Sequence, residues 1–140
     1  MDKKIKALAT HLKIDSLEIK EVRGESFEAE GCEYLVLKDD EADELARDSI
    51  LESLWAFNAD FIASHSKASL DDHAIQALKE LQASLCESAN AIVKSLIEDL
   101  DHFVDDAIKS DGRAHFLNTY DGDEHEIQVG NEWFYIYRID

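Results

Sequence analysis

The sequence predicts an α+β fold in which an antiparallel sheet, built from early strands and a C-terminal hairpin, packs against a helical middle segment. Apolar and polar residues alternate near both ends of the chain, as is typical of half-buried strands. Between residues 40 and 112, apolar residues instead recur at spacings of three and four, as is typical of amphipathic helices. Strands at both ends with helices between them indicate a segregated α+β architecture.

The first elements are predicted from residues 2–37. Asp2 can cap a helix, because its carboxylate can accept a hydrogen bond from a free backbone N–H of the first turn. The apolar stripe of this helix consists of Ile5, Leu8, Ala9 and Leu12. Residues 17–22 alternate as a half-buried strand, residues 23–26 form a turn, and residues 34–37 are apolar enough for a more buried strand.

Helices are expected in the middle of the chain. Residues 39–41 are all acidic and supply an N-cap and a negative first turn for a helix over residues 40–64. The segment 64–69 ends this helix, and Ser69 with Asp72 resembles a capping box for the next one.

A longer helical pattern runs from Leu78 to Ala107 and stops near Gly112. A single helix of that length would measure about 60 Å, which a compact domain of this size cannot easily cover. We therefore expect a break near residues 84–90, and the sequence alone leaves open whether the region is one helix or two.

The end of the chain is predicted to be a β-hairpin. Residues 126–129 and 133–139 alternate around Gly130-Asn131, an acceptable two-residue turn. We expect this hairpin to join the early strands in one antiparallel sheet, with the helices packed on one face. Because no repeat, proline or linker-like run divides the chain, we predict one domain over residues 1–140.

The net charge of −18 is the most distinctive property of the chain, and it is unevenly distributed. Residues 1–38 hold seven Lys/Arg and eight Asp/Glu, whereas residues 39–140 hold seven and twenty-four. Solubility calls for a net charge of only about 2–8. Because self-repulsion of the excess weakens the compact state, a function that needs the charge is favoured alongside a purely solubilising surface.

The composition disfavours several classes of protein. No apolar run approaches the roughly 18–20 residues that span a bilayer, so we expect no membrane association. Phosphate contacts need clustered Lys and Arg, and the densest cluster is four lysines within residues 3–13, so direct nucleic-acid binding is not expected. Cys32 and Cys86 are far apart and are expected to be reduced thiols, as in a cytoplasmic protein.

The densest polar chemistry lies in residues 111–126, which contain acids, two histidines, an arginine and a tyrosine. The segment lacks the calcium-loop pattern, no histidine pair has zincin spacing, and no cysteine pair is close. Ser110, His115 and Asp121 could be drawn as a catalytic set, but no strand–turn–helix elbow presents the serine. We therefore predict no enzyme, no catalytic residue, no metal and no cofactor.

Carboxylates recur along the second half of the chain in a way that could imitate a row of phosphates. Duplex DNA carries one charge per about 1.7 Å of its axis, and acids at successive helical turns could present a comparable row to a basic groove. Residues 39–44 extend this set. The predicted partner-binding residues are Glu98, Asp99, Asp101, Asp105, Asp106, Asp121, Asp123, Glu124 and Glu126. A solvated acidic face without a partner is the alternative.

The aromatic residues of the last strand allow a second kind of interface. Alternation places Trp133, Tyr135 and Tyr137 on one face of this strand, with Phe134 and Ile136 on the other. Aromatic residues on both faces indicate core packing on both sides, or one side covered by a partner or a second copy.

Several blocks of the sequence resemble a group of small acidic bacteriophage and prophage proteins without a settled activity, over about two-thirds of the chain. The residues that carry the resemblance are Glu33–Leu37 running into Asp40–Glu44, Ser53–Asn58, Asp111–Arg113 with His115-Phe116, Tyr120–Gly122 and Tyr135–Arg138. The sequence departs from the pattern at Ala114, where a second glycine is expected. No functional residue carries over from this group.

The resemblance implies a phage protein that acts in the cytoplasm of a host bacterial cell. Small acidic phage proteins often resemble inhibitors of host defence, including anti-CRISPR and anti-restriction proteins, several of which are DNA mimics. We therefore expect an acidic inhibitor that binds a basic nucleic-acid-binding host protein. The alternative is an assembly or adaptor module that forms a homodimer or partner interface through aromatic and helical surfaces.

Overall fold

The computed structural model describes residues 2–140 and confirms the α+β class. The chain divides into two compact units. The first, here called the sheet unit, comprises the residues up to Ala46 together with Asp111–Asp140, and the second, the helical unit, comprises Arg47–Ser110. The prediction of one domain over residues 1–140 stays a prediction.

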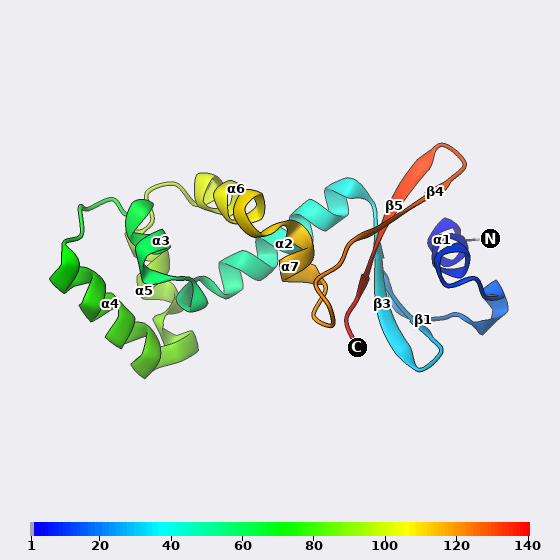
Figure 1. Cartoon of the computed structure of the whole chain (residues 1–140), viewed down its shortest axis with the longest axis horizontal. Coiled ribbons are helices and arrows are strands. Elements are labelled where there is room, and N and C mark those ends of the chain that lie inside the picture. Colours follow the sequence, from blue (N-terminus) through cyan, green and yellow to red (C-terminus); the bar gives the residue numbers. More distant parts are fainter. Residues whose placement is uncertain (1) are drawn as a thin grey trace. The chain divides into compact units, whose positions relative to one another are not determined.

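The sheet unit contains a five-stranded antiparallel sheet in the order β1-β2-β3-β5-β4 (Figure 1). Its strands are β1 (Lys20–Arg23), β2 (Ser26–Ala29), β3 (Cys32–Leu37), β4 (His125–Val129) and β5 (Glu132–Arg138). The predicted C-terminal hairpin is β4–β5, and it joins the early strands because β5 pairs with β3, Val36 facing Ile136. The prediction of one antiparallel sheet is therefore confirmed.

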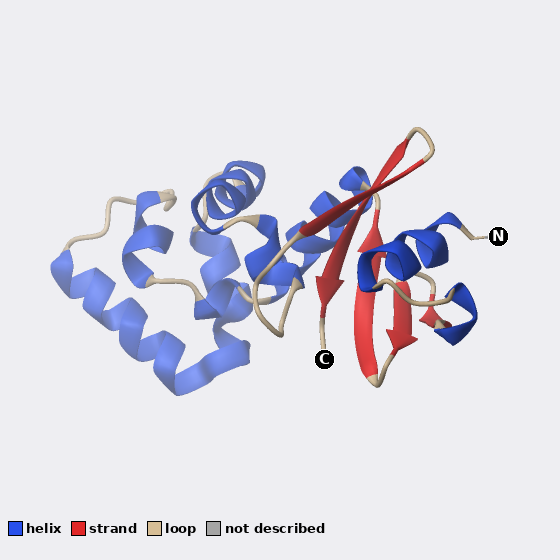
Figure 2. Ribbon diagram, turned by 45° about the vertical axis from the view of Figure 1, so that its right-hand side comes forward, coloured by secondary structure: helices blue, strands red, loops and turns tan. Residues whose placement is uncertain are grey.

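Helix α1 (Lys3–Leu12) packs on one face of this sheet (Figure 2). It begins as predicted, with the side chain of Asp2 accepting a hydrogen bond from the backbone N–H of Lys4. The fully buried side chains of Leu8, Phe27 and Phe134 meet between the helix and the sheet. The predicted stripe of α1 is confirmed, since its other members are buried or partly buried against the same core.

The opposite face of β5 is also covered. Helix α7 (Arg113–Leu117) contacts β5, and Tyr137 on this face is fully buried, while Tyr135 is half-buried. Core packing on both sides therefore explains most of the aromatic content of β5. Trp133, near the start of the strand, remains 48% exposed.

The strand predicted over residues 17–22 is largely wrong. The segment Ser16–Glu18 forms a 3-10 turn, because the side chain of Asp15 accepts from the N–H of Leu17 and caps it. The strand β1 starts only at Lys20, lies at the edge of the sheet and is exposed throughout. Alternation misled the prediction because Leu17 is 90% exposed, whereas Ile19 is buried.

The helical unit consists of helices joined by turns and short loops. Its elements are the end of α2 (Asp39–Glu52), α3 (Ala59–Ser64), α4 (Asp72–Leu85), α5 (Asn90–Leu96) and α6 (Leu100–Asp111), with 3-10 turns at Leu54–Ala56 and Cys86–Ala89. The predicted break near residues 84–90 is confirmed, and a second, unpredicted break separates α5 from α6. No helix within residues 2–140 is long and apolar enough to cross a membrane.

Two predictions about helix ends are wrong. The helix expected over residues 40–64 ends at Glu52, and α3 starts again after Asn58, whose side chain accepts from the N–H of Asp60. The N-cap of α4 is Asp71, which accepts from Ala74, so Ser69 and Asp72 form no capping box. In both places a local side-chain cap satisfies free N–H groups at the start of the following helix, α3 or α4.

Two side-chain amides hold the segment between α2 and α3, which contains the 3-10 turn at Leu54–Ala56, in place. The side-chain NH₂ of Gln82 donates to the carbonyls of Trp55, at 2.8 Å, and Phe57, at 2.7 Å. The side-chain NH₂ of Asn90 donates to the carbonyl of Leu51, and its oxygen accepts from the N–H of Trp55. These bonds satisfy backbone groups that a continuous helix would have paired internally.

Two histidines meet where α1 packs on β4. The rings of His11 and His125 lie with their centroids 4.5 Å apart. Burial, together with repulsion by His125, lowers the pKa of His11 below its ordinary value of 6.5. The folded sheet unit therefore binds this proton more weakly than the unfolded chain does.

The stability of the sheet unit should fall as the pH drops below 6.5, because acidification favours the unfolded chain, in which His11 takes up its proton more readily. Substituting His125→Gln removes the repulsion and should reduce this loss. Urea unfolding followed by circular dichroism between pH 7.5 and 5.5 measures the free energy of unfolding. This range lies above the pH at which most carboxylates titrate. A control, His73→Gln, changes an exposed histidine of the helical unit and should keep the wild-type pH dependence. Parallel curves for wild type and His125→Gln would contradict the prediction.

Candidate functional site

In the sheet unit, acidic residues gather around the guanidinium of Arg113, at the start of α7. Its Nη1 lies 2.7 Å from Asp39 Oδ1 and 2.9 Å from Asp43 Oδ1, and its Nε lies 2.7 Å from Glu124 Oε1. The guanidinium also lies over the ring of Tyr135, 4.5 Å from its centroid. The predicted acids 39–44 and 121–126 are thus brought together in part, but around a cation that pairs with three of them.

Burial and hydrogen bonding set the charges of this group. The side chain of Arg113 is only 13% exposed. Burial alone would lower the pKa of Arg113, but hydrogen bonds to Glu124, Asp39 and Asp43 raise it above its ordinary value. Burial raises the pKa of Tyr137, and so does the hydrogen bond that its hydroxyl donates to Glu124. The group therefore holds a permanent cation, and the neutral phenol keeps its proton.

The loop before β4 is organised by the buried side chain of Asn118. Its NH₂ donates to Asp121 Oδ1 and to the carbonyl of Asp123, both at 2.7 Å. Its oxygen accepts from the N–H groups of Tyr120 and Asp121. Of the predicted partner-binding residues in the sheet unit, Asp121 and Glu124 thus hold the fold, whereas Asp123 and Glu126 have exposed side chains.

Some of the predicted acids of the helical unit cap a helix or form an ion pair, and others have exposed side chains. Asp99 caps α6 by accepting from the N–H of His102 at 3.2 Å, and Asp101 pairs with Arg47. Glu98 and Asp105 are exposed. An open depression beside the start of α6 mixes both signs, its lining including Arg47, Lys67, Lys94, Glu98, Asp99 and Asp101.

The two groups of predicted residues belong to different units. The residues from Glu98 to Asp106 lie in the helical unit, and those from Asp121 to Glu126 lie in the sheet unit. Each group is therefore a surface of its own unit. That all nine residues bind one partner stays a prediction.

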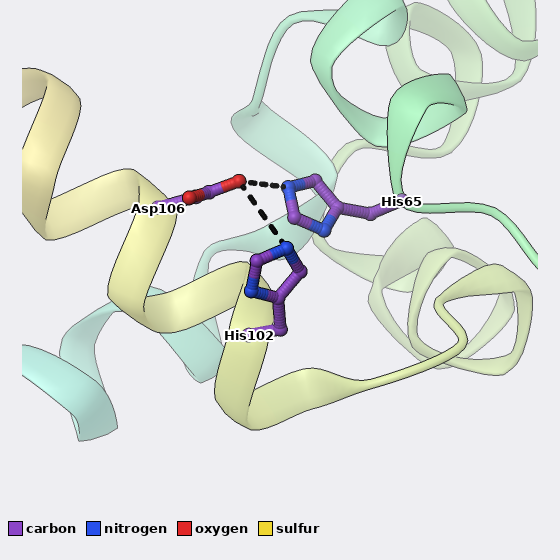
Figure 3. Close-up of side chains that lie close together, drawn as sticks. All are labelled: His65, His102 and Asp106. Atoms are coloured by element: carbon purple, nitrogen blue, oxygen red, sulfur yellow. Dashed lines mark ion pairs between the residues drawn. The ribbon is translucent and has the colours of Figure 1, made fainter.

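The structure also brings together three side chains that the sequence analysis did not connect: His65, His102 and Asp106 (Figure 3). The Nε2 atom of His65 lies 2.9 Å from Asp106 Oδ2, and the Nε2 atom of His102 lies 3.7 Å from the same oxygen. One ligand atom from each residue lies within 4.8 Å of the other two. The side chain of His65 is 6% exposed, whereas those of His102 and Asp106 are 65% and 41% exposed.

Local backbone pairing places His65 beside α6. His65 is the residue that ends α3, and its carbonyl accepts from the N–H of Glu98 at 2.9 Å. The next residues continue this contact, since Ser66 bridges Ile97 in an antiparallel fashion. His102 and Asp106 lie four residues apart on α6, so they share the face of the helix that this segment meets.

Aromatic rings fix the orientation of the His65 imidazole. Its centroid lies 5.1 Å from that of Phe61 and 5.2 Å from that of Phe103, which is fully buried. The ring of His102 lies 5.0 Å away on the solvent side. The buried histidine is therefore held by packing, and only the outer edge of the group faces solvent.

The sequence does not predict this group, because His65 comes from a turn 37 positions before His102 and no fixed spacing joins them. The spacing of His102 and Asp106, four residues apart on an expected helix, was the one signal available for half of the group. Within residues 2–140, the histidines, cysteines and acids that lie close enough together to hold a metal ion are His65, His102 and Asp106.

Comparisons with known proteins add no relative: no family model, no curated protein and no solved structure matches the chain.

Replacing Arg113 by Met should destabilise the sheet unit by about 2 kcal/mol, because Glu124 loses its cationic partner inside a partly buried group. Urea unfolding followed by circular dichroism measures this change. The double variant R113M/E124Q should recover part of the loss, since a neutral amide needs no cation. The control Arg23→Met changes an exposed arginine of β1 and should alter the stability by less than about 0.5 kcal/mol. Equal losses for R113M and R23M would show that the arginine has no such role.

Proposed function

We propose that this protein binds the basic, nucleic-acid-binding surface of a partner protein and blocks it by presenting carboxylates in place of phosphates. The partner is expected to be a host defence or nucleic-acid-processing protein of a bacterial cell. This setting comes from the resemblance to small acidic phage proteins, which often resemble anti-restriction and anti-CRISPR inhibitors, several of which are DNA mimics.

The observation that carries the proposal is the excess of carboxylates in both units. The sheet unit contains twenty Asp/Glu and nine Lys/Arg, and the helical unit contains twelve and five. Some acids cap a helix or form an ion pair within their own unit. Such local roles do not account for most of the excess of Asp and Glu over Lys and Arg. A field of one sign over a whole surface steers a partner of the opposite sign towards it.

The side chains best suited to face a partner are the exposed acids that hold no part of the fold. Glu98 and Asp105 fit this description in the helical unit, and Asp123 and Glu126 fit it in the sheet unit. Asp99, Asp101, Asp121 and Glu124 are engaged in caps or pairs within their own unit. These four acids stabilise the fold beneath the surface, and their charges add to the negative field that a partner meets.

The first test is affinity capture from bacterial lysate at low and raised salt, with duplex DNA as competitor. A DNA- or RNA-binding protein that is retained at low salt and released by duplex DNA supports the proposal. Its affinity should fall steeply with salt, because exposed charges more than about 8 Å apart are screened at physiological ionic strength. Capture that is insensitive to both salt and duplex DNA would contradict mimicry.

Charge reversal should locate the binding surface. We expect E98K/D105K, D123K/E126K or both to weaken binding to the captured partner by at least about tenfold, since each change places like charges opposite the basic surface. The matched control E18K/E21K makes the same change in net charge at exposed positions outside the predicted surface. Binding constants from calorimetry at two salt concentrations measure the effect. Equal losses for the control and both test variants would mean that only net charge matters.

A second candidate function is assembly through an apolar surface, and the exposure of Trp133 favours it. This indole is 48% exposed on β5, and Gln128 faces it across the strand pair on β4. A half-exposed indole offers a large apolar area that a partner could cover.

If this surface makes a homodimer, Trp133→Ala should convert it to a monomer, whereas the neighbouring Gln128→Ala should leave it assembled. Sedimentation velocity at low and high salt measures the species, and the dimer should survive high salt because apolar burial is not screened. A wild-type protein that is monomeric at all concentrations would rule out this homodimer.

A further inference from the structure

We propose that His65, His102 and Asp106 form a binding site for a divalent transition-metal ion, with Zn²⁺ as the best match. The site lies wholly within the helical unit and does not depend on the proposed binding to a basic partner.

The distances between the ligand atoms fit a metal ion. In a tetrahedral zinc site with bonds of about 2.0–2.1 Å, two ligand atoms lie about 3.3 Å apart. The two Nε2 atoms lie 2.9 and 3.7 Å from Asp106 Oδ2, on either side of that value. All three ligand atoms lie within 4.8 Å of one another, so small rotations of the exposed His102 and Asp106 side chains are enough to close the site (Figure 3).

The ligand types select the class of metal. Two imidazole nitrogens and one carboxylate oxygen suit zinc and its neighbours among the divalent transition metals. Ca²⁺ and Mg²⁺ prefer shells built from oxygen alone, so they should compete poorly here. The neighbouring exposed carboxylates, such as Asp105, favour any cation by their field without supplying a ligand.

The site is organised before the metal arrives. His65 is held by backbone pairing to Glu98 and by ring contacts with Phe61 and Phe103. The other two ligands lie on one turn of α6, which fixes their separation. Little conformational entropy therefore has to be lost on binding, which is the usual advantage of a preorganised site.

An ion pair between His65 and Asp106 is the simplest alternative explanation, and it accounts for the shorter of the two distances. It does not require the second imidazole, yet His102 directs its Nε2 towards the same oxygen although its side chain is 65% exposed. Two imidazoles around one carboxylate oxygen are the arrangement that a shared cation would stabilise.

The fourth position of the metal would be open. His102 lines the wide depression at the start of α6, so a water molecule or a side chain of another protein can approach the outer side of the group. Three protein ligands with one exchangeable position are typical of zinc sites that bind an additional ligand.

The test is a zinc titration of the full chain by calorimetry, in competition with a chelator of known affinity. We expect one zinc ion per chain, and His102→Ala and Asp106→Asn should each weaken binding by at least about 100-fold. His102 is exposed, so His102→Ala should leave the melting temperature of the metal-free protein unchanged. Zinc should raise the melting temperature of the wild type and leave that of His102→Ala unaltered.

Two matched controls separate this site from weak binding to the acidic surface. Asp105→Asn makes the same change in charge on the same helix, and His73→Ala removes an exposed histidine of α4. Both should bind zinc within about threefold of the wild type. No zinc binding by the wild type, or equal losses in the controls and the test variants, would overturn the proposal. Excess Ca²⁺ or Mg²⁺ should not displace the zinc, and displacement would assign the ion to the carboxylates instead.

Discussion

The interaction on which the sheet unit most depends is the pairing of Arg113 with three carboxylates. A chain with so large an excess of acids must keep them apart or pair them with cations where the fold brings them close. Arg113 does the latter for Asp39 and Asp43 at the start of α2 and for Glu124 before β4. Gly112, the N-cap residue of α7 directly before Arg113, has a φ of 81°, which glycine adopts without the strain of a side chain. Segments distant in sequence thus meet at one nearly buried cation.

The sequence predicted the elements whose signals are local. The cap of α1 by Asp2 and the alternation of β5 needed no knowledge of distant residues. The break between α2 and α3 was missed because the apolar period continues through it, with Leu54 still fully buried in the 3-10 turn. What ends the helix is the pairing of this turn with Gln82 and Asn90, and such tertiary hydrogen bonds leave no periodic trace in the sequence.

The same distinction applies to the candidate sites. Composition alone predicted an acidic surface, but it could not say which acids the fold would occupy. Glu124 and Asp101 have partners 11 and 54 positions away, Arg113 and Arg47, so their engagement depends on packing. The group around Asp106 follows the same rule, since its buried member, His65, arrives through the antiparallel bridge between Ser66 and Ile97.

We propose two ligands for this protein, a basic protein surface and a metal ion. The negative charge of the chain attracts both, but the interactions that hold them differ in range. The field of the exposed carboxylates draws in both, but it is screened over about 8 Å at physiological salt. Coordination by two imidazoles and a carboxylate acts at bond length and is hardly screened, so raised salt should weaken protein binding far more than zinc binding. Because His102 opens onto a depression that also contains Glu98 and Lys94, a metal held there would change the charge of that surface. Partner binding through the helical unit would then depend on zinc, whereas binding through Asp123 and Glu126 of the sheet unit would not.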